Sequence, residues 1–228
     1  MTGLADVERV FFSFPEVTDP ARHAAYNRWH QFDHLPQNLA LPGVRHGQRW
    51  VRTPELRASS HVGGGVLAGD LDAAHYVAMY WFAAPTRDSV RQWVRLGSRA
   101  GEVGRRPDVE WTRRRFTGFF TPVASAVGER ALVTAGAVPH LPHAGVVLDA
   151  TPAADAPLDV KAVAALPGML GAFAFEGEHA CEGLRVTLGW VSRDPGAVAA
   201  TWPSSHGATV LRTGLEIVTP ERWDWFAT

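Results

Sequence analysis

The feature that most constrains this fold is a Leu-Pro-Gly turn that occurs twice, at 41–43 and at 166–168. In both places the turn follows a helix-compatible segment and precedes an apolar run, so it marks the passage from a helix to a strand. The third apolar run of each half also recurs, with Trp190 in the place of Trp81. The two Leu-Pro-Gly turns are 125 residues apart, and the two tryptophans are 109 residues apart. One long insertion in the first half accounts for the difference. The sequence therefore predicts an internal duplication.

Apolar runs predict four strands and two helices in the first half. The strands are expected at Val10–Phe14, Val44–Arg52, His75–Phe82 and Arg115–Pro122, and the helices begin near Asp19 and Thr86. The first helix should end near His34, because Pro36 disfavours helical dihedrals at Leu35. The Gly-containing segment 53–72 is expected to be a loop over or beside the functional site. The order βαββαβ is that of a ferredoxin-like unit.

The second half repeats this order more briefly. Strands are expected at Gly145–Leu148, Gly168–Phe175, Leu184–Val191 and Thr209–Val218, with helices at Leu158–Ala165 and from Asp194 towards His206. We therefore predict an α+β fold of two tandem ferredoxin-like repeats: 1–124, a linker over 125–142, and a degenerate second copy over 143–228. Each repeat leaves one sheet face bare, so the two sheets should close into a pseudo-dimeric barrel with a cavity where packing is incomplete.

Composition and charge exclude several classes of protein. A net charge of −1 argues against nucleic acid or an anionic membrane as a partner, and the arginines at 105–106 and 113–115 have acidic residues between them, which favours a solvated surface. The single Cys181 excludes an internal disulfide and a Cys-rich metal site. No apolar run reaches the length of a membrane span, so we expect a cytoplasmic protein. Trp223 and Trp225 are expected to close the barrel or to form a homodimer interface.

One pair of ionisable residues has no counterpart in the second half. Asp33 and His34 stand side by side before Pro36, whereas the second turn is preceded by Lys161-Ala162-Val163-Ala164. An imidazole titrates near neutrality and can transfer protons, and a nearby carboxylate can orient it. Adjacent residues on an ideal helix point about 100° apart, so a direct pair requires the distortion that Pro36 favours. A solvated histidine at a helix C-terminus is the alternative interpretation.

The strand at 44–52 presents two faces, and either can meet a cavity. His46, Gln48 and Trp50 share one face, and Arg45, Gly47 and Arg49 share the other. Tyr76 and Tyr80 share a face of the next strand, where their hydroxyl groups can donate hydrogen bonds to a carbonyl oxygen. The predicted catalytic residues are His34, Asp33, Arg49 and Tyr80, and the predicted substrate-binding residues are Trp29, His30, His46, Trp50 and Tyr76.

Asn27, Trp29, the run Asp33-His34-Leu35-Pro36 and Leu41-Pro42-Gly43 together resemble the EthD-like branch of the dimeric α+β barrel superfamily. That superfamily includes small-molecule isomerases, polyketide cyclases, monooxygenases and some haem enzymes. In proteins that this chain resembles, the equivalent histidine often faces the cavity, which implies the same for His34. The motif covers about thirty residues and specifies the fold better than the reaction.

Three hypotheses for function follow. The leading one is a cofactor-independent enzyme of lyase or isomerase type, similar to a polyketide cyclase, that acts on a small apolar carbonyl compound. In it, His34 moves a proton, Asp33 tunes the imidazole, and Arg49 or Tyr80 stabilises the oxyanion. The second is a haem or metal enzyme with His30 or His34 as a ligand, although no third protein ligand for a metal ion is evident. The third is a non-catalytic carrier of a hydrophobic metabolite, because the second half has lost the acid–histidine pair.

Overall fold

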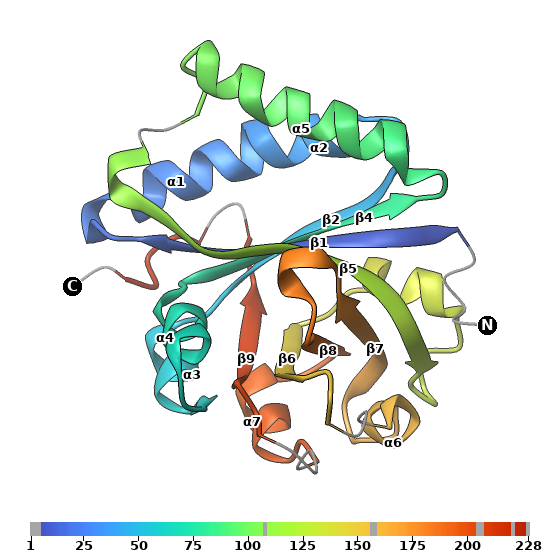
Figure 1. The fold of residues 1–228 in the computed structure, drawn as a ribbon. Helices are drawn as coiled ribbons and strands as arrows, with labels where there is room; N and C mark the ends of the chain where they lie inside the picture. The colour runs from blue at the N-terminus through green and yellow to red at the C-terminus, as the bar shows by residue number, and fades with distance from the viewer. Residues whose placement is uncertain (1–5, 107–108, 156–158, 204–207, 220–221, 227–228) are drawn as a thin grey trace.

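The computed structural model describes residues 6–106, 109–155, 159–203, 208–219 and 222–226. Its centre is a closed antiparallel barrel of eight strands (Figure 1). These are β1 (Val7–Val17), β2 (Val44–Val51), β4 (Tyr76–Ala83), β5 (Thr112–Val127), β6 (Gly145–Pro152), β7 (Met169–Gly177), β8 (Leu184–Val191) and β9 (Leu211–Ile217). Their order is β2-β4-β1-β5-β7-β8-β6-β9, and Trp50 of β2 pairs with Ile217 of β9. The barrel therefore closes within one chain.

The two halves of the barrel have the same strand arrangement. Counting strands within each half, the order is second, third, first, fourth in both. β5 joins the halves, because it pairs with β1 from Thr112 to Phe120 and with β7 from Phe120 to Val127. The residues at 125–127, which were predicted to begin a linker, thus belong to a strand.

Large apolar side chains fill the barrel interior. Alternate residues of β1, including Phe12 and Phe14, point inward and are almost fully buried. Trp190 lies at the centre, with its ring 6.1 Å from that of Trp50 and 6.2 Å from that of Trp81. The expectation of a cavity between the two sheets was wrong for this region, because these bulky aromatic side chains occupy the space.

Helices cover the outer face of each half-sheet (Figure 1). The first half carries a continuous helical segment and the long α5 (Thr86–Glu102). The second half carries only α6 (Val160–Ala164) and α7 (Pro195–Ala200), whose apolar residues pack directly on the sheet. α7 ends before His206, which lies outside the described residues. The long helices of the first half leave a hollow above the sheet, as described below.

The first helical segment continues beyond His34, contrary to the prediction. It consists of η1 (Pro20–Arg22), α1 (His23–Trp29), η2 (His30–His34) and α2 (Leu35–Leu39). The η2 turn is a π-helix, in which the Leu35 N–H donates to the His30 carbonyl. Pro36 has no N–H, and in a regular α-helix its ring clashes with the carbonyl four residues earlier. Widening the turn accommodates the proline, and such π-turns are frequent at functional sites.

The segment 53–72 is folded and lies against the barrel. It contains α3 (Pro54–Ala58), β3 (His61–Val62) and most of α4 (Val66–Ala73), and β3 adds to the free edge of β9. Leu71 belongs to the barrel core, and no residue of this segment contributes to the cavity of the first half. The predicted loop beside the site was therefore wrong, because its apolar residues form short helices that bury against the strands. The remaining short elements are η3 (Val109–Trp111), η4 (Ala135–His140) and η5 (His179–Cys181).

Among the described residues, no helix combines the length and apolar character needed to cross a bilayer.

Candidate functional site

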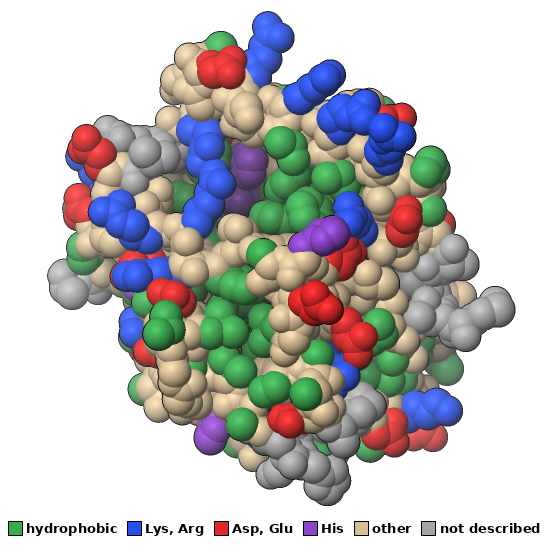
Figure 2. Space-filling view, viewed as in Figure 1, with side chains coloured by type: hydrophobic (Ala, Val, Ile, Leu, Met, Phe, Trp, Pro, Cys, Tyr) green, Lys and Arg blue, Asp and Glu red, His purple; other side chains and the backbone are tan. Residues whose placement is uncertain are grey.

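A cavity of about 390 Å³ lies between the helices of the first half and the outer face of its sheet. Aromatic side chains are prominent in its walls, among them Phe11, Trp29, Tyr80, Trp93 and Phe119, and polar side chains stand between them. Figure 2 shows the opening, in which a histidine is visible between basic side chains on one side and hydrophobic side chains on the other. This size and lining are typical of small-molecule sites. We refer to it as the helix–sheet pocket.

The strand alternation explains how the pocket acquires its floor. Phe11 and Ser13 of β1 and Ala78 and Tyr80 of β4 point away from the barrel towards the helices. Ser13 and Ala78 are small and leave space under α5. A Cβ atom at Gly47 of the neighbouring β2 would lie 2.7 Å from the Tyr80 ring, so only glycine allows that ring its position.

His34 is held in a fixed orientation on the pocket wall. The Asn38 Nδ2 lies 3.1 Å from its Nε2, and the Trp29 ring stacks on the imidazole at 4.8 Å. When the amide donates to Nε2, the neutral imidazole carries its proton on Nδ1. Burial, followed by the positive charges of Arg106 and Arg49, lowers the pKa of His34 to about 4. The ring is therefore neutral at physiological pH.

Asp33 does not bond to His34, although the sequence predicted that it would tune the imidazole. Its carboxylate accepts from both Nη2 and Nε of Arg105, at 2.6 and 3.2 Å. The negative charge of Asp33 raises the pKa of His34, but less than burial, Arg106 and Arg49 lower it. Adjacent helical residues diverge, and the π-turn does not overcome that divergence. Asp33 instead ties η2 to the segment after α5.

Arg49 and Tyr76 form a buried network behind the pocket wall. The Arg49 guanidinium is only 2% exposed and lies 5.0 Å from the centres of both the Tyr26 and Tyr76 rings. Its Nη2 donates to the Asn27 Oδ1 at 2.9 Å, and the Asn27 Nδ2 donates to the Tyr76 hydroxyl at 2.9 Å. His23 Nδ1 lies 2.8 Å from the same hydroxyl. Tyr26 lines the pocket and Arg49 does not, so Arg49 acts there through its charge.

Tyr80, predicted as catalytic, and His30, predicted as substrate-binding, both belong to the pocket wall. The Tyr80 hydroxyl is buried and has no hydrogen-bond partner among the described residues, and neither does the Asn38 Oδ1. Burial raises the pKa of Tyr80, and Asn38 opposes this rise. His30 lies with its ring centre 4.9 Å from that of His34, and burial, helped by the charge of Arg49, lowers its pKa well below the usual value.

His46 and Trp50 do not reach the helix–sheet pocket, although the sequence predicted both as substrate contacts. They occupy the face of β2 that points into the barrel, where His46 contacts the rings of Trp81 and His140 at 5.5 and 4.9 Å. The opposite face, with Gly47 and Arg49, meets the helices. The alternation of side chains along the strand assigned these residues to the correct two faces. The packing of the whole barrel decides which of the two faces meets the pocket.

Sequence reasoning missed several residues of this site. Neither Trp93 of α5 nor Asn38 was singled out as a candidate site residue. Arg106 and Arg114 were expected on a solvated surface, yet both line the pocket. One signal in the sequence could have indicated them. Arginines cluster at 105–106 and again at 113–115, at the two ends of the connection between α5 and β5. Their closeness to His34 depends on tertiary structure and is not visible in the spacing.

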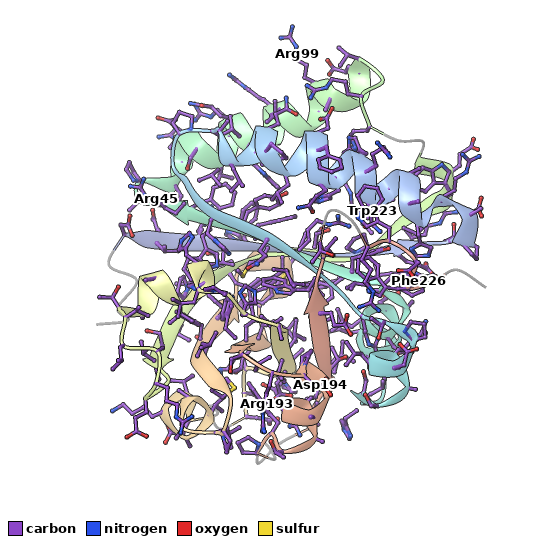
Figure 3. All side chains as sticks on the ribbon, turned by 180° about the vertical axis from the view of Figure 1, so that it is seen from behind. Arg45, Arg99, Arg193, Asp194, Trp223 and Phe226 are labelled. Carbon is purple, nitrogen blue, oxygen red and sulfur yellow. The ribbon has the colours of Figure 1, made fainter. Side chains whose placement is uncertain are left out.

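The aromatic residues near the C-terminus pack against α1 and η2 of the same chain. The Phe226 ring stacks on His23 at 4.1 Å, and Trp223 meets the ring of Phe32 at 5.9 Å. Trp225 is 9% exposed and belongs to the same apolar cluster as Tyr76. Figure 3 shows Trp223 and Phe226 beside this helical segment. These aromatic residues therefore cover the outside of the buried network and do not close the barrel.

Comparison with known proteins identifies the fold and leaves the reaction open. No family model matches the sequence, and no curated protein matches it. A solved structure assigned as a monooxygenase, from Fusobacterium nucleatum subsp. nucleatum, aligns with 93% of this chain and 94% of its own, at 5% identity and a TM-score of 0.55. A structure assigned as a chlorite dismutase aligns with 96% and 98%, at 11% identity and a TM-score of 0.53. The chain thus has the fold of the dimeric α+β barrel proteins.

The donor atoms restrict which histidine suits a haem or metal. Within the described part of the chain, no group of three His, Cys, Asp or Glu side chains is placed to hold a metal ion. The Nε2 of His34 lies 3.1 Å from the Asn38 Nδ2, so binding a haem iron through this atom would break that contact. The His30 Nδ1 is buried and has no hydrogen-bond partner among the described residues. If a haem binds here, His30 is the residue whose donor atom fits.

Proposed function

We propose that this protein is a cofactor-independent acid–base enzyme, of lyase or isomerase type, that acts on a small, largely apolar carbonyl compound. One observation carries the proposal: His34 is neutral, fixed by Asn38 and Trp29, and set in an aromatic pocket. A positioned imidazole that is neutral at pH 7 can exchange a proton with a bound substrate. The polyketide-cyclase-like character and the EthD-like branch remain parts of the proposal and rest on the motif resemblance.

The charges around His34 favour the same chemistry. Arg106 and Arg49 lower its pKa because positive charge opposes the imidazolium. The same positive field stabilises negative charge that develops on a substrate oxygen. Enolisation then breaks a C–H bond next to the carbonyl, transfers the proton to the unprotonated nitrogen of the His34 imidazole, and places the electron pair on the carbonyl oxygen as an enolate. In the tautomer set by Asn38 this nitrogen is Nε2, which exchanges the Asn38 hydrogen bond for the substrate proton. Return of the proton from the imidazolium to carbon reverses the step.

We also propose that the barrel consists of two tandem ferredoxin-like repeats. The support is the identical strand order of the two halves and the repeated Leu-Pro-Gly turn. The second repeat then serves as a scaffold, since α6 and α7 pack directly on its sheet. The division between the repeats falls within β5, because this strand pairs with both halves.

The test is exchange of the α-protons of 2-tetralone for deuterium in D2O, followed by NMR. This step is common to cyclisation, isomerisation and decarboxylation of carbonyl compounds. The wild-type protein should accelerate exchange, and His34→Ala should lower the rate about a hundredfold. His61→Ala is the matched control, because His61 is exposed on β3 and lies outside the pocket. Asp33→Asn should have a smaller effect than His34→Ala, because Asp33 bonds to Arg105.

Two outcomes would contradict the proposal. Near-normal exchange in His34→Ala would remove His34 from the reaction. Binding of 2-tetralone by the wild-type protein without any acceleration of exchange would favour the carrier hypothesis.

A haem enzyme with His30 as a ligand is the second candidate, and the buried, unpartnered Nδ1 of His30 is the observation that favours it. Bound haem would supply redox chemistry that the chain's own side chains lack. The measurement is the absorption spectrum of purified protein reconstituted with haem. A Soret band that His30→Ala shifts and His34→Ala leaves in place would support this candidate, and protein that retains no haem would remove it.

A further inference from the structure

The residues that the structure describes around the helix–sheet pocket place positive charge on its wall. Its described lining includes the cationic side chains of Arg106, Arg113 and Arg114 and no carboxylate. The neighbouring basic residues are neutralised: Arg105 pairs with Asp33, and Arg115 pairs with Glu16.

Arg106 and Arg114 differ from these neighbours. Within the described ranges, neither has a carboxylate within ion-pair distance. Arg106 is half-buried, and burial together with the nearby charge of Arg114 lowers its pKa. Arg114 is exposed. Two guanidinium groups that line one pocket without a carboxylate partner among the described residues repel each other, and the half-burial of Arg106 reduces the screening of that repulsion. Such an arrangement is favourable once a negative group binds between them.

The position of this pair relative to His34 is informative. His34, Arg106 and Arg114 line the same pocket. The two arginines therefore share a cavity with the proposed proton-transfer group, and their charges lower its pKa. Phe11, Tyr80 and Trp93 form a contiguous aromatic wall of the pocket, with the Phe11 and Trp93 rings 4.6 Å apart and the Tyr80 and Trp93 rings 5.9 Å apart. Flat aromatic walls favour a planar ligand.

We propose that the ligand of this pocket is a planar aromatic carboxylate whose anionic group is bound by Arg106 and Arg114. The inference deepens the proposed function and rests on it for the chemistry, although ligand binding can be tested without any turnover. Guanidinium groups bind carboxylates through paired N–H donors, which also orients the ligand. In this arrangement the carboxylate lies at the arginine side of the pocket, and the ring extends along the aromatic wall towards His34.

The test compares 2-naphthoate with its neutral isostere 2-naphthamide, by isothermal titration calorimetry on the full chain. The two probes share the ring system and differ in charge. Variants Arg106→Gln and Arg114→Gln each remove one cation. Arg99→Gln is the control with the same change in net charge, because Arg99 is exposed on α5, projects into solvent in Figure 3 and does not line the pocket. Thermal denaturation checks that each variant is folded.

The wild-type protein should bind 2-naphthoate at least about tenfold more tightly than 2-naphthamide, since hydrogen bonds between charged groups are worth about 1.5–3 kcal/mol. Both pocket variants should abolish this preference, and Arg99→Gln should retain it. Higher salt should weaken 2-naphthoate binding only. Equal affinity for the two probes, a preference that survives both pocket variants, or no binding of either probe would overturn the inference. The 2-tetralone exchange assay on His34→Ala is unaffected by these outcomes, so each proposal can fail separately.

Discussion

At the scale of single residues, the contact between Asn38 and His34 determines how the imidazole works. Asn38 is 1% exposed and lies one turn beyond His34, so its amide is fixed by packing. We predict that Asn38→Asp raises the pKa of His34 from about 4, because a carboxylate beside the ring favours its charged form. The acid limb of the 2-tetralone exchange rate should then move to higher pH. Asn38→Leu should slow exchange without shifting the acid limb of the pH–rate profile to higher pH. An acid limb at the wild-type pH in Asn38→Asp would contradict the positioning role of Asn38.

The lowered pKa of His34 also predicts the pH dependence of the wild-type protein. With a pKa of about 4, the imidazole stays neutral as the pH falls from 8 to about 5, so exchange catalysed by His34 should remain constant over that range. The rate should fall only as the pH approaches 4. Initial rates corrected for folded fraction by circular dichroism provide the measurement. If the rate were half-maximal near pH 6.5, the ordinary pKa of a histidine side chain, His34 would not be in the environment described.

At the scale of secondary structure, the π-turn is the element that shapes the site. It widens the helix at His30–His34 and lets the chain continue through Pro36. We predict that Pro36→Ala allows a regular α-helix, which would leave stability unchanged or raise it by about 1 kcal/mol while lowering exchange about tenfold. Urea denaturation and the exchange assay measure the two effects. Full activity in a variant of unchanged or greater stability would show that the widened turn does not matter.

The elements also show what could be predicted from sequence. Strand alternation and helical spacing are local, so the order of strands and helices was predictable, as was the shared face of Tyr76 and Tyr80. The π-turn was not, because Pro36 indicates a helix end unless the surrounding packing keeps the helix together. The placement of Arg106 and Trp93 beside His34 depends on contacts between distant segments, and one sequence does not specify them. For the second half, the only signal about its role was the absence of a counterpart to the Asp33–His34 pair.

At the scale of the whole molecule, buried neutral histidines make stability depend on pH. Burial lowers the pKa of His23 to about 4 and that of His46 to about 3. Between these values and the unfolded pKa of about 6.5, the unfolded chain binds more protons than the folded one. The contribution of these neutral histidines to the free energy of unfolding is therefore fully present above pH 6.5, and it is lost as the pH falls towards their folded pKa values. We predict a marked fall in Tm between pH 6.5 and 4.5, smaller in His46→Gln; a constant Tm across that interval would contradict the burial of these rings.

The central claim is that function resides between the helices and the sheet of the first half, and not inside the barrel. The barrel interior holds Trp50, Trp81 and Trp190, whereas the helix–sheet pocket holds His34. The most direct measurement is a crystal structure of the protein soaked with 2-naphthoate. The account predicts the ring between Trp29 and Trp93, beside His34. A ring found in the barrel, against Trp50 and Trp190, would contradict it.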